Sequence, residues 1–406
     1  MKKVAIIGSG ISGLACAHFL SDQPNSEVVL YEKNDYIGGH ARTVDITVDG
    51  TDIAVDTGFI VFNQRNYPQL TKFFADLDVA TIKSNMSFGV SIANTLEYGT
   101  YHRGGLFAQK RNILRAKFYR MLLDIIKFNN KAKHYIATNQ QLTLGELLEQ
   151  LKLGKWFRDY YILAMGASIW STPLAKMLDF PAVTFIRFFD NHGLLNLKNR
   201  PQWYTVQGGS RQYINKLLAR RKFQYHTNSP VNKITPTDAG VRVDFAQASS
   251  KVYDQVILAT HSDQALALLA RPTMSQQQVL AAIKYQPNHM VLHGDVSFMP
   301  KNRRAWSSWV YLTDHDGRVS LSYWMNNLQN LPTQKPVIIT LNPARRPQNI
   351  YDEYQFSHPV FDTAAIQAQQ LIKQIQGQDN IYFAGAWQRY GFHEDGFLSA
   401  ATLFTN

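Results

Sequence analysis

The sequence predicts an α/β fold in which a second, α+β domain is inserted into a discontinuous first domain. The chain has 406 residues, more than a single hydrophobic core usually serves, so two domains are expected. A strand–helix–strand pattern occupies residues 1–32 and recurs over 203–260, and a strand and a helix follow over 382–404. Because the segments between these three parts follow other patterns, the three parts are expected to fold together.

The expected domain boundaries follow from this pattern. The first domain would comprise residues 1–70, 203–270 and 375–406, and the second would comprise residues 71–202 and 271–374. The earlier inserted segment is predicted to be helical, because apolar residues recur at helical spacing in "RNILRAKFYRMLLDIIKFNNKAKHYI". The later one alternates as strands do, for example in "RVSLSYWMN" and "PVIITLN", which predicts an antiparallel sheet.

The N-terminal segment carries the glycine pattern of a dinucleotide-binding turn. An apolar strand, "VAII", runs through Gly8, Gly10 and Gly13 into a helix. Gly8 permits a tight turn, Gly10 lets the backbone approach a pyrophosphate, and Gly13 lets helix and strand pack closely. A second strand, "EVVLYE", ends on Glu32, whose carboxylate suits the two ribose hydroxyls. The sequence therefore predicts a bound dinucleotide.

The composition favours a protein of a reducing compartment. Hydrophobic residues make up 45% and charged residues 18% of the chain, an ordinary globular mixture. The single cysteine, Cys16, excludes an intramolecular disulfide framework, and glycines interrupt the apolar N-terminal run that would otherwise imitate a signal peptide. No stretch reaches the roughly 18 apolar residues of a membrane-spanning helix. We therefore expect a cytoplasmic location.

Several other functional classes find no support in the sequence. The twelve histidines show neither HExxH nor another metal-ligand spacing, so no metal site is expected. Neither the G-x-S-x-G of a serine hydrolase nor the phosphate-cradling GxxxxGKS/T is present.

A basic segment, residues 101–134, contributes much of the net charge of +12. Its one acid is Asp124, and its basic residues are Arg103, Lys110, Arg111, Arg115, Lys117, Arg120, Lys127, Lys131 and Lys133. We expect this segment to contact an anionic membrane surface at the inner face of the membrane, with a merely solvated helix face as the alternative. Phe118 falls on the apolar helix face instead of being free to stack on bases, so no nucleic acid partner is expected.

The stretches "EKNDYIGGHART" and "DTGF" resemble the flavin-containing amine oxidase superfamily, which includes monoamine oxidases, phytoene desaturases and protoporphyrinogen oxidases. The resemblance implies FAD and a Rossmann-like FAD-binding domain, glutathione-reductase-like and of the amine-oxidase type. His40 stands where these families usually have arginine, which makes Arg42 the favoured phosphate partner. The residues expected to bind FAD are Gly8, Gly10, Ser12, Gly13, Glu32, Lys33, Gly39, His40, Arg42, Gly58, Phe59, Val231, Asp395, Gly396 and Phe397.

The C-terminal stretch "YFAGAWQRYGFHEDGFLSAATLF" is expected to return to the FAD domain. In the same superfamily the last helix points its N-terminus at the N1/O2 edge of the flavin, where a partial positive charge stabilises the reduced form. Asp395 is expected to cap this helix. Trp387, Tyr390 and His393 precede it and are candidates for the substrate face, with His393 a candidate general base. The FAD is expected to be non-covalent, because Cys16 belongs to the first helix.

Further strings, among them "GFIVFNQRNYPQLTKFFADLDV", "LATHSDQALALL" and "GFHEDG", look like the FAD-dependent oxidoreductases related to the N-terminal oxidase-like domain of plant cyclopropane fatty acid synthases. This likeness runs along almost the whole chain. It implies desaturation, oxidation or double-bond isomerisation of a lipid or fatty acyl chain, with a fatty-acyl-modifying methyltransferase as a candidate partner. Two alternatives stay open, namely an amine or amino-acid oxidase and a non-catalytic, flavin-bearing accessory subunit.

Overall fold

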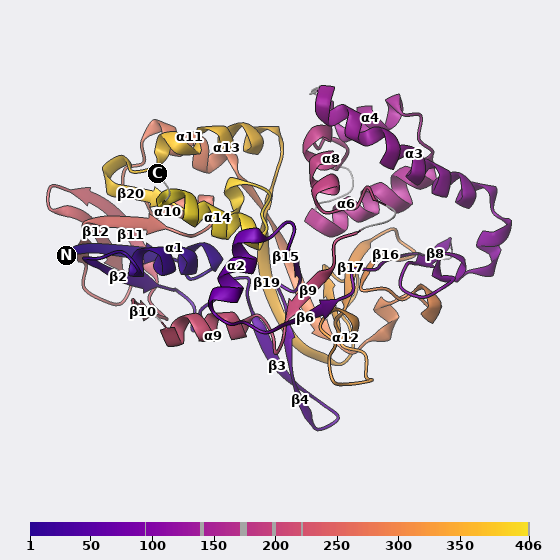
Figure 1. Cartoon of the computed structure of the whole chain (residues 1–406), viewed down its shortest axis with the longest axis horizontal. Helices are drawn as coiled ribbons and strands as arrows, with labels where there is room; N and C mark the ends of the chain where they lie inside the picture. The colour runs from indigo at the N-terminus through magenta and orange to yellow at the C-terminus, as the bar shows by residue number, and fades with distance from the viewer. Residues whose placement is uncertain (94, 139–141, 171–176, 197–199, 221, 405–406) are drawn as a thin grey trace.

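The computed structural model describes residues 1–93, 95–138, 142–170, 177–196, 200–220 and 222–404. Figure 1 shows two lobes, with the long strands β15 and β19 running between them. The first lobe holds a parallel sheet, and the second holds a mixed sheet covered by helices. The predicted α/β class is thereby confirmed. No described helix combines the length and apolar character that a bilayer crossing requires.

The parallel sheet is assembled from distant parts of the chain. Its order is β10-β2-β1-β14-β20, and each strand runs parallel to its neighbours. The strands are β1 (Lys2–Ile7), β2 (Ser26–Tyr31), β10 (Gln224–His226), β14 (Gln255–Leu258) and β20 (Ile381–Phe383). Residues 4–7 of β1 are buried on both faces, as a parallel strand between two helical layers requires.

Each face of this sheet has its own covering layer. One face packs against α1 (Ile11–Ser21), α2 (Pro68–Asp76), α9 (Arg211–Arg220) and α14 (His393–Phe404). The other packs against α10 (Ser262–Leu268), α11 (Met274–Ala282), α13 (Thr363–Ile375) and the small sheet of β11 (Val231–Thr237), β12 (Gly240–Phe245) and β13 (Lys251–Tyr253). Val4 and Ile6 face the first layer and Ala5 and Ile7 the second, so the period of two along β1 divides the core.

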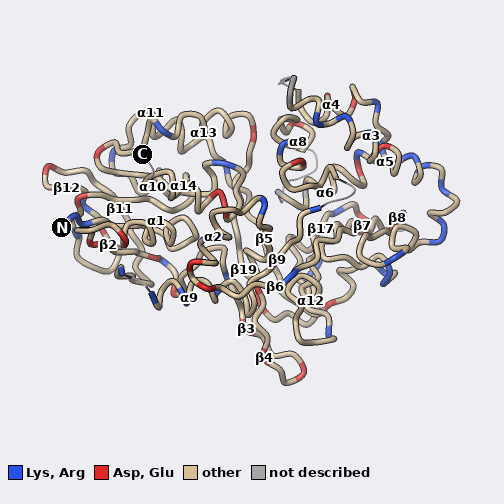
Figure 2. Tube along the Cα trace, in the orientation of Figure 1, with Lys and Arg blue, Asp and Glu red and all other residues tan. Residues whose placement is uncertain are grey.

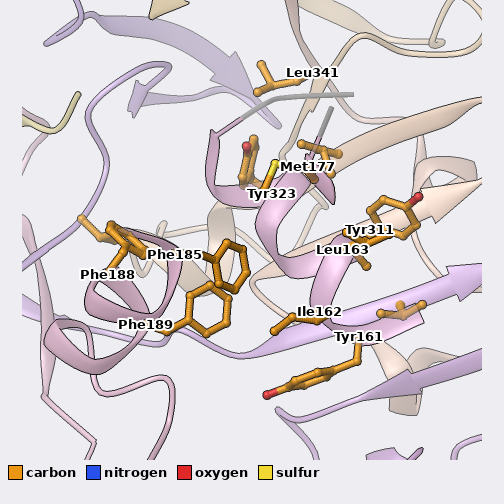
Figure 3. Packing of buried hydrophobic residues seen from close by; sticks show 14 of the residues in the cluster. Tyr161, Ile162, Leu163, Met177, Phe185, Phe188, Phe189, Tyr311, Tyr323 and Leu341 are labelled. Carbon is orange, nitrogen blue, oxygen red and sulfur yellow. The ribbon is translucent and has the colours of Figure 1, made fainter. Parts of the chain in front are cut away.

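The second lobe is built on a seven-stranded sheet of order β19-β15-β18-β17-β16-β7-β8. Its strands are β7 (Phe88–Ile92), β8 (Leu96–Gly99), β15 (Lys284–His293), β16 (Trp309–Thr313), β17 (Val319–Trp324), β18 (Ile338–Leu341) and β19 (Ile350–Val360). The covering helices are α3 (Ala116–Thr138), α4 (Leu144–Gln150), α5 (Lys155–Phe157), α6 (Leu163–Trp170) and α8 (Ala182–Asn191). Figure 3 shows Phe185 and Phe189 of α8 on one side of α6 and Tyr311 of β16 on the other, all within one apolar core.

The second lobe differs from the sequence prediction in two respects. The segment 71–202 is not wholly helical, because it supplies β7 and β8, and β7 adds a parallel pair with β16 to a sheet whose strands from segment 271–374 pair antiparallel with one another, as predicted. Both strands are short and contain a glycine. A Cβ on Gly99 would lie 2.3 Å from the carbonyl oxygen of Ala305, so a neighbouring loop passes too close for any other residue. This glycine weakens the strand pattern on which a sequence prediction depends.

Two smaller sheets connect the lobes. The hairpin of β3 (Thr43–Val48) and β4 (Thr51–Asp56) turns at Asp49 and Gly50, which both have positive φ, as two-residue hairpin turns require. The second small sheet contains β5 (Phe62–Asn63), β6 (Thr81–Ser84) and β9 (Trp203–Val206), and α12 (Met325–Leu328) follows β17.

Candidate cofactor and substrate site

The turn between β1 and α1 forms a bare backbone cradle. A Cβ on Gly13 would lie 1.9 Å from the carbonyl oxygen of Gly8, so only glycine lets α1 pack onto the strand end. Gly39 has a φ of +58°, and a Cβ there would lie 2.9 Å from Cα of Gly10, so the two loops meet backbone to backbone. The space beside Gly10 itself is open. A bare backbone at a helix N-terminus suits a pyrophosphate.

Glu32 lies directly after β2, at the carboxyl end of the parallel sheet, and is buried. Its Oε2 accepts hydrogen bonds from the backbone N–H (3.0 Å) and hydroxyl (2.6 Å) of Ser9, and its Oε1 accepts one from the N–H of Asn34 (2.9 Å). A carboxylate has about four acceptor positions, so Glu32 is held in place with capacity left for a ribose hydroxyl. Ser229 donates its N–H to the carbonyl of Glu32, which brings the segment leading to Val231 alongside.

The N-termini of α1 and α14 meet beside this cradle. A Cβ on Gly396 would lie 2.7 Å from Cγ2 of Ile11 and 2.9 Å from Oγ of Ser12, so glycine is required for the approach. Phe397, the next residue, is buried in the core beneath. Two helix N-termini, each with a partial positive charge, therefore face the same region.

Asp395 does not precede the C-terminal helix as an N-cap, contrary to the prediction. The helix begins at His393, so Asp395 is its third residue. Its Oδ2 accepts the backbone N–H of Phe392 at 3.0 Å, and Nε of Arg389 lies 3.6 Å from its Oδ1. From its position in the first turn, Asp395 therefore gives a hydrogen-bond partner to the backbone N–H of the residue that precedes the helix. Burial raises the pKa of Asp395 to about 6, although these donors act in the opposite direction.

Phe59 and His393 form one wall of the site. The backbone N–H of Phe59 donates to the carbonyl of His40, and a Cβ on Gly58 would lie 2.2 Å from that same oxygen. His393 stacks on the Phe59 ring, and the hydroxyl of Tyr213 lies 3.1 Å from its Nε2. Tyr213 is fully buried in α9 and was not predicted; its place becomes evident only when α9 packs beside α14.

Three histidines from different elements lie close together at this point. The His40 ring centroid is 5.3 Å from that of His358 and 6.3 Å from that of His261. Nδ1 of His358 is 2.9 Å from Nδ2 of Asn288, so it accepts a hydrogen bond and leaves the proton on Nε2. His261 stacks on Tyr285 at 4.3 Å. Among the described residues, Nε2 of His40 is buried without a hydrogen-bond partner.

These histidines are held neutral. Burial lowers the pKa of His40 and His261 to about 4 and that of His358 to about 3, and the charge of a neighbouring histidine adds to each effect. His261 and His358 were not predicted. The position of His261 in the turn after a parallel strand was a usable signal, whereas nothing local marks His358 on β19. No group of His, Cys, Asp and Glu side chains in the described ranges is arranged to hold a metal ion.

Arg42, the predicted phosphate partner, is paired with an acid of the other lobe. Its guanidinium makes two hydrogen bonds to Asp352 of β19, at 2.6 and 3.1 Å, and lies over the Tyr354 ring at 4.5 Å. It also donates to the hydroxyl of Thr57 at 3.2 Å. The two parallel hydrogen bonds to one carboxylate match the planar fork of arginine, so Arg42 links the cradle to the long strand.

The remaining predicted residues occupy varied positions. Lys33 is exposed. Trp387 is buried in the core beneath α11 and α13, and its Nε1 donates to the carbonyl of Thr260 at 3.1 Å. Tyr390 is partly buried, with Arg389 6.0 Å from its ring centroid. His393 is therefore the member of this trio that stacks directly on Phe59.

Asp56 anchors the loop that precedes α9. Its carboxylate accepts hydrogen bonds from the N–H and hydroxyl of Ser210, the hydroxyl of Thr43 and the side chain of Gln329. Burial raises the pKa of Asp56 to about 6, although these hydrogen bonds lower it. The residue was recognised in sequence only as part of "DTGF", and its partners lie in three other segments.

The described residues fit an FAD. The cradle of Gly10 and Gly39 is bare, Nε2 of His40 lacks a partner, and Glu32 is fixed at the sheet edge where a ribose would lie. Cys16 is fully buried inside α1, and burial raises the pKa of its thiol, so it cannot serve as a covalent attachment point. These observations favour a non-covalent dinucleotide.

A wall of aromatic rings extends from this site into the second lobe. Phe188 of α8 stacks on Phe392 with centroids 5.0 Å apart and on His192 at 3.8 Å, and His192 faces Trp203 at 6.1 Å. Burial lowers the pKa of His192 to about 4, so this ring too is neutral at pH 7. These rings therefore form a packed, uncharged contact between α8 and the residue that precedes His393.

Comparison with known proteins agrees with this geometry. Residues 11–341 match the protein family described as flavin containing amine oxidoreductase. The chain is 26% identical over 307 residues to a 4,4'-diaponeurosporene oxygenase of Staphylococcus haemolyticus, across 64% of this chain and 57% of that protein. It is 21% identical over 304 residues to a farnesylcysteine lyase of Arabidopsis thaliana, across 67% and 60%. The chain thus spans less than two thirds of the length of these curated relatives.

Solved structures share the fold over nearly the whole chain. A fatty acid isomerase of P. acnes that produces CLA has a TM-score of 0.70 at 14% identity, covering 99% of this chain and 97% of that one. A putrescine oxidase bound to putrescine has a TM-score of 0.68 at 14% identity, covering 100% and 99%. At these identities the similarity shows the fold alone.

Proposed function

The chain belongs to the flavin containing amine oxidoreductase family, whose cofactor is FAD, and from this premise we propose that it acts on the acyl chain of a lipid. The reaction would be a desaturation, an oxidation or a double-bond isomerisation. FAD, when bound, supplies the two-electron redox chemistry of such reactions. The residues of this chain bind the cofactor, shape the substrate surface and exclude water.

The aromatic wall carries the proposal. The rings of Phe188, His192, Phe392 and Trp203 form an uncharged stack next to His393, and a site lined by such rings suits an apolar chain. The nearest carboxylates are engaged elsewhere: Glu394 accepts the N–H groups of residues 69 and 70, and Asp395 accepts that of Phe392. Neither is placed to pair with a substrate ammonium group, which favours a lipid over a charged amine.

The names of the related proteins also support a lipid substrate. The two curated relatives are named for diaponeurosporene and for farnesylcysteine, and one solved structure with this fold is named a fatty acid isomerase. The fatty acid isomerase and the putrescine oxidase share this fold equally, so the fold leaves the amine alternative to experiment. We also propose that the chain is related to the oxidase-like domain of plant cyclopropane fatty acid synthases and cooperates with a fatty-acyl-modifying methyltransferase in the cytoplasm.

The test uses the flavin as its own reporter. Purified holoprotein is incubated without oxygen with unsaturated fatty acids and phospholipids or with small amines, and visible absorption is followed together with product analysis by mass spectrometry. A lipid substrate that is oxidised should reduce the flavin and so remove its visible absorption, and admission of air should restore that absorption. Product analysis is required because an isomerisation leaves the flavin oxidised at the end of each turnover.

Two variants sharpen the result. Phe188→Leu should lower turnover of lipid without changing bleaching by a chemical reductant, whereas Phe128→Leu, in the buried face of α3, serves as the matched core control. Bleaching by amines with no change in any lipid would establish the amine-oxidase alternative. Bleaching by the reductant alone would favour an accessory subunit.

A further inference from the structure

Exposed apolar side chains are concentrated in the basic segment. Of the ten large hydrophobic residues that the described structure leaves exposed, six lie between residues 101 and 126. They are Tyr101, Ile113, Leu114, Tyr119, Leu123 and Ile126. The most exposed of these is Leu114, at 89%, at the end of the 3₁₀ turn Lys110–Leu114 that leads into α3. A concentration of this kind marks an interaction surface.

The outer side of α3 carries an apolar stripe. Phe118, Met121, Phe128 and Ala132 are fully buried and form the face that packs on the second lobe. Tyr119, Leu123 and Ile126 follow one another at spacings of four and three residues, so they share a different face. Their exposed fractions are 42%, 62% and 43%, which shows that no described element covers them.

A basic stripe runs beside the apolar one. Arg120, Lys127 and Lys131 repeat at spacings of seven and four on the outer side of α3. The one acid of the segment, Asp124, is buried and accepts hydrogen bonds from Arg120 and from the N–H of Gly154, so it does not offset the outer charge. Figure 2 shows Lys and Arg gathered along this edge of the second lobe.

Several of these cations lack an acidic partner. Within the described ranges, no ion pair joins an acid to Arg103, Lys110, Lys117, Lys127 or Lys131, whereas Lys133 pairs with Asp190 at 2.6 Å. Unpaired positive charge around exposed aliphatic side chains matches an anionic bilayer surface, which offers phosphate groups above an apolar interior. A nucleic acid would match the charge but would leave Leu114 and Leu123 in water.

We propose that residues 101–134 form a docking surface for an anionic phospholipid bilayer. Leu114, Leu123 and Ile126 would enter the interfacial region, and Arg103, Lys110, Lys117, Lys127 and Lys131 would lie among the phosphate groups. This inference goes beyond the proposed function, because it rests on the outer surface of α3 and not on the site beside His393. It places the second lobe against the lipid and leaves the FAD lobe in solution.

Co-sedimentation of the full-length holoprotein with vesicles tests the proposal. Vesicles of saturated phosphatidylcholine are compared with vesicles in which a quarter of the lipid is saturated phosphatidylglycerol, at low and at high salt. The protein should bind the anionic vesicles, and binding should weaken as salt rises. Saturated lipids keep desaturation and isomerisation products from confusing the readout.

Matched single substitutions locate the surface. Leu114→Ser should reduce binding to anionic vesicles at least several-fold, whereas Met274→Ser, at a residue that is equally exposed (88%) on α11, should leave it unchanged. Lys117→Gln should weaken binding roughly fivefold, and Lys373→Gln, on α13, should not. These side chains are exposed, so folding should survive each change.

Clear outcomes would overturn the proposal. Equal binding to neutral and anionic vesicles at low salt would show that the basic residues do not bind lipid phosphate groups. Unchanged binding by Leu114→Ser would show that Leu114 does not enter the bilayer. Binding to DNA but not to vesicles would point to a nucleic acid partner. Because turnover of unsaturated fatty acids is measured in a separate experiment without vesicles, failure of docking and failure of the proposed reaction are distinguishable.

Discussion

The imidazole of His393 lies flat against the ring of Phe59, with centroids 3.8 Å apart and the two planes 8° from parallel. Burial lowers the pKa of His393 to about 3, and the nearby His40 adds to the effect. The ring is therefore neutral at pH 7 and is a much weaker base than its sequence context suggests. In this structure it acts as a stacked, hydrogen-bonded part of the site wall.

Loss of the Tyr213 hydroxyl should destabilise this wall. Tyr213→Phe removes the partner of His393 Nε2 and should lower the free energy of unfolding by roughly 1–3 kcal/mol, because a buried polar atom is left unsatisfied. Urea unfolding measures the change. Tyr311→Phe, in another buried tyrosine, is the control, because none of the described residues forms a hydrogen bond to its hydroxyl. Equal effects of both substitutions on the free energy of unfolding would contradict a stabilising hydrogen bond between Tyr213 and His393.

Removing the Glu32 carboxylate should weaken FAD retention. Glu32→Ala deletes the acceptor for the ribose, at a cost of roughly 1.5–3 kcal/mol, about 10- to 150-fold in affinity. Flavin fluorescence after dialysis reports the loss. Ser9→Ala is the informative comparison, because Ser9 donates to Glu32 and disturbs the loop without removing the carboxylate. A Glu32→Ala protein that keeps its full complement of FAD would show that the ribose lies elsewhere.

Substitutions at Arg42 and Asp352 should show whether Arg42 stabilises the fold through its ion pair or binds the FAD pyrophosphate. Both side chains are largely buried, at 17% and 18% exposure, and their two hydrogen bonds should contribute roughly 1–3 kcal/mol to stability. We expect Arg42→Lys and Asp352→Asn each to lower the free energy of unfolding of the apoprotein by a similar amount. If Arg42→Lys instead releases FAD while Asp352→Asn does not, the arginine binds the pyrophosphate as the sequence predicted.

The histidines beside the cradle should make stability fall in acid. An unfolded histidine titrates near pH 6.5, whereas the pKa of His358 in the folded protein is about 3 and that of His40 about 4. Between these values the unfolded chain binds more protons, so the free energy of unfolding decreases as pH falls from 6.5 toward 4. The raised pKa of Asp56 and that of Asp395, both about 6, act in the opposite direction.

Substitution of one histidine should reduce this pH dependence. His358→Gln removes one titrating group. Between pH 4 and 6.5 the slope of the unfolding free energy against pH should therefore drop by up to the contribution of one bound proton. Denaturant titrations at several pH values measure the slope. His315→Gln provides a comparison at an exposed loop histidine between β16 and β17 of the same lobe. A His358→Gln slope identical to that of the unsubstituted protein would show that His358 titrates normally.

Much of the cofactor cradle could be predicted because neighbouring residues encode it. Gly8, Gly10 and Gly13 lie within six positions, and Glu32 directly follows the very next strand. The turn at Asp49 and Gly50 was predictable for the same reason, since two residues suffice to define it.

The partners of these residues could not be predicted from local patterns. Arg42 meets Asp352 across a separation of 310 residues, and Tyr213 meets His393 across 180. Such pairs depend on how β19 and α9 pack, and no spacing rule reports that packing. The strands β7 and β8 were missed because Gly89 and Gly99 lower strand propensity while tertiary packing favours them.

The order of strands in the parallel sheet has a consequence for how the protein is made. On the ribosome, β1 and β2 emerge early, yet β14, the other neighbour of β1, is synthesised more than 200 residues later, and β20 later still. Until then the nascent chain exposes an unpaired strand edge and has no α14 to meet α1. The contact between α1 and α14 can therefore form only after the C-terminal strand and helix have been made, and pairing between such distant strands is slow.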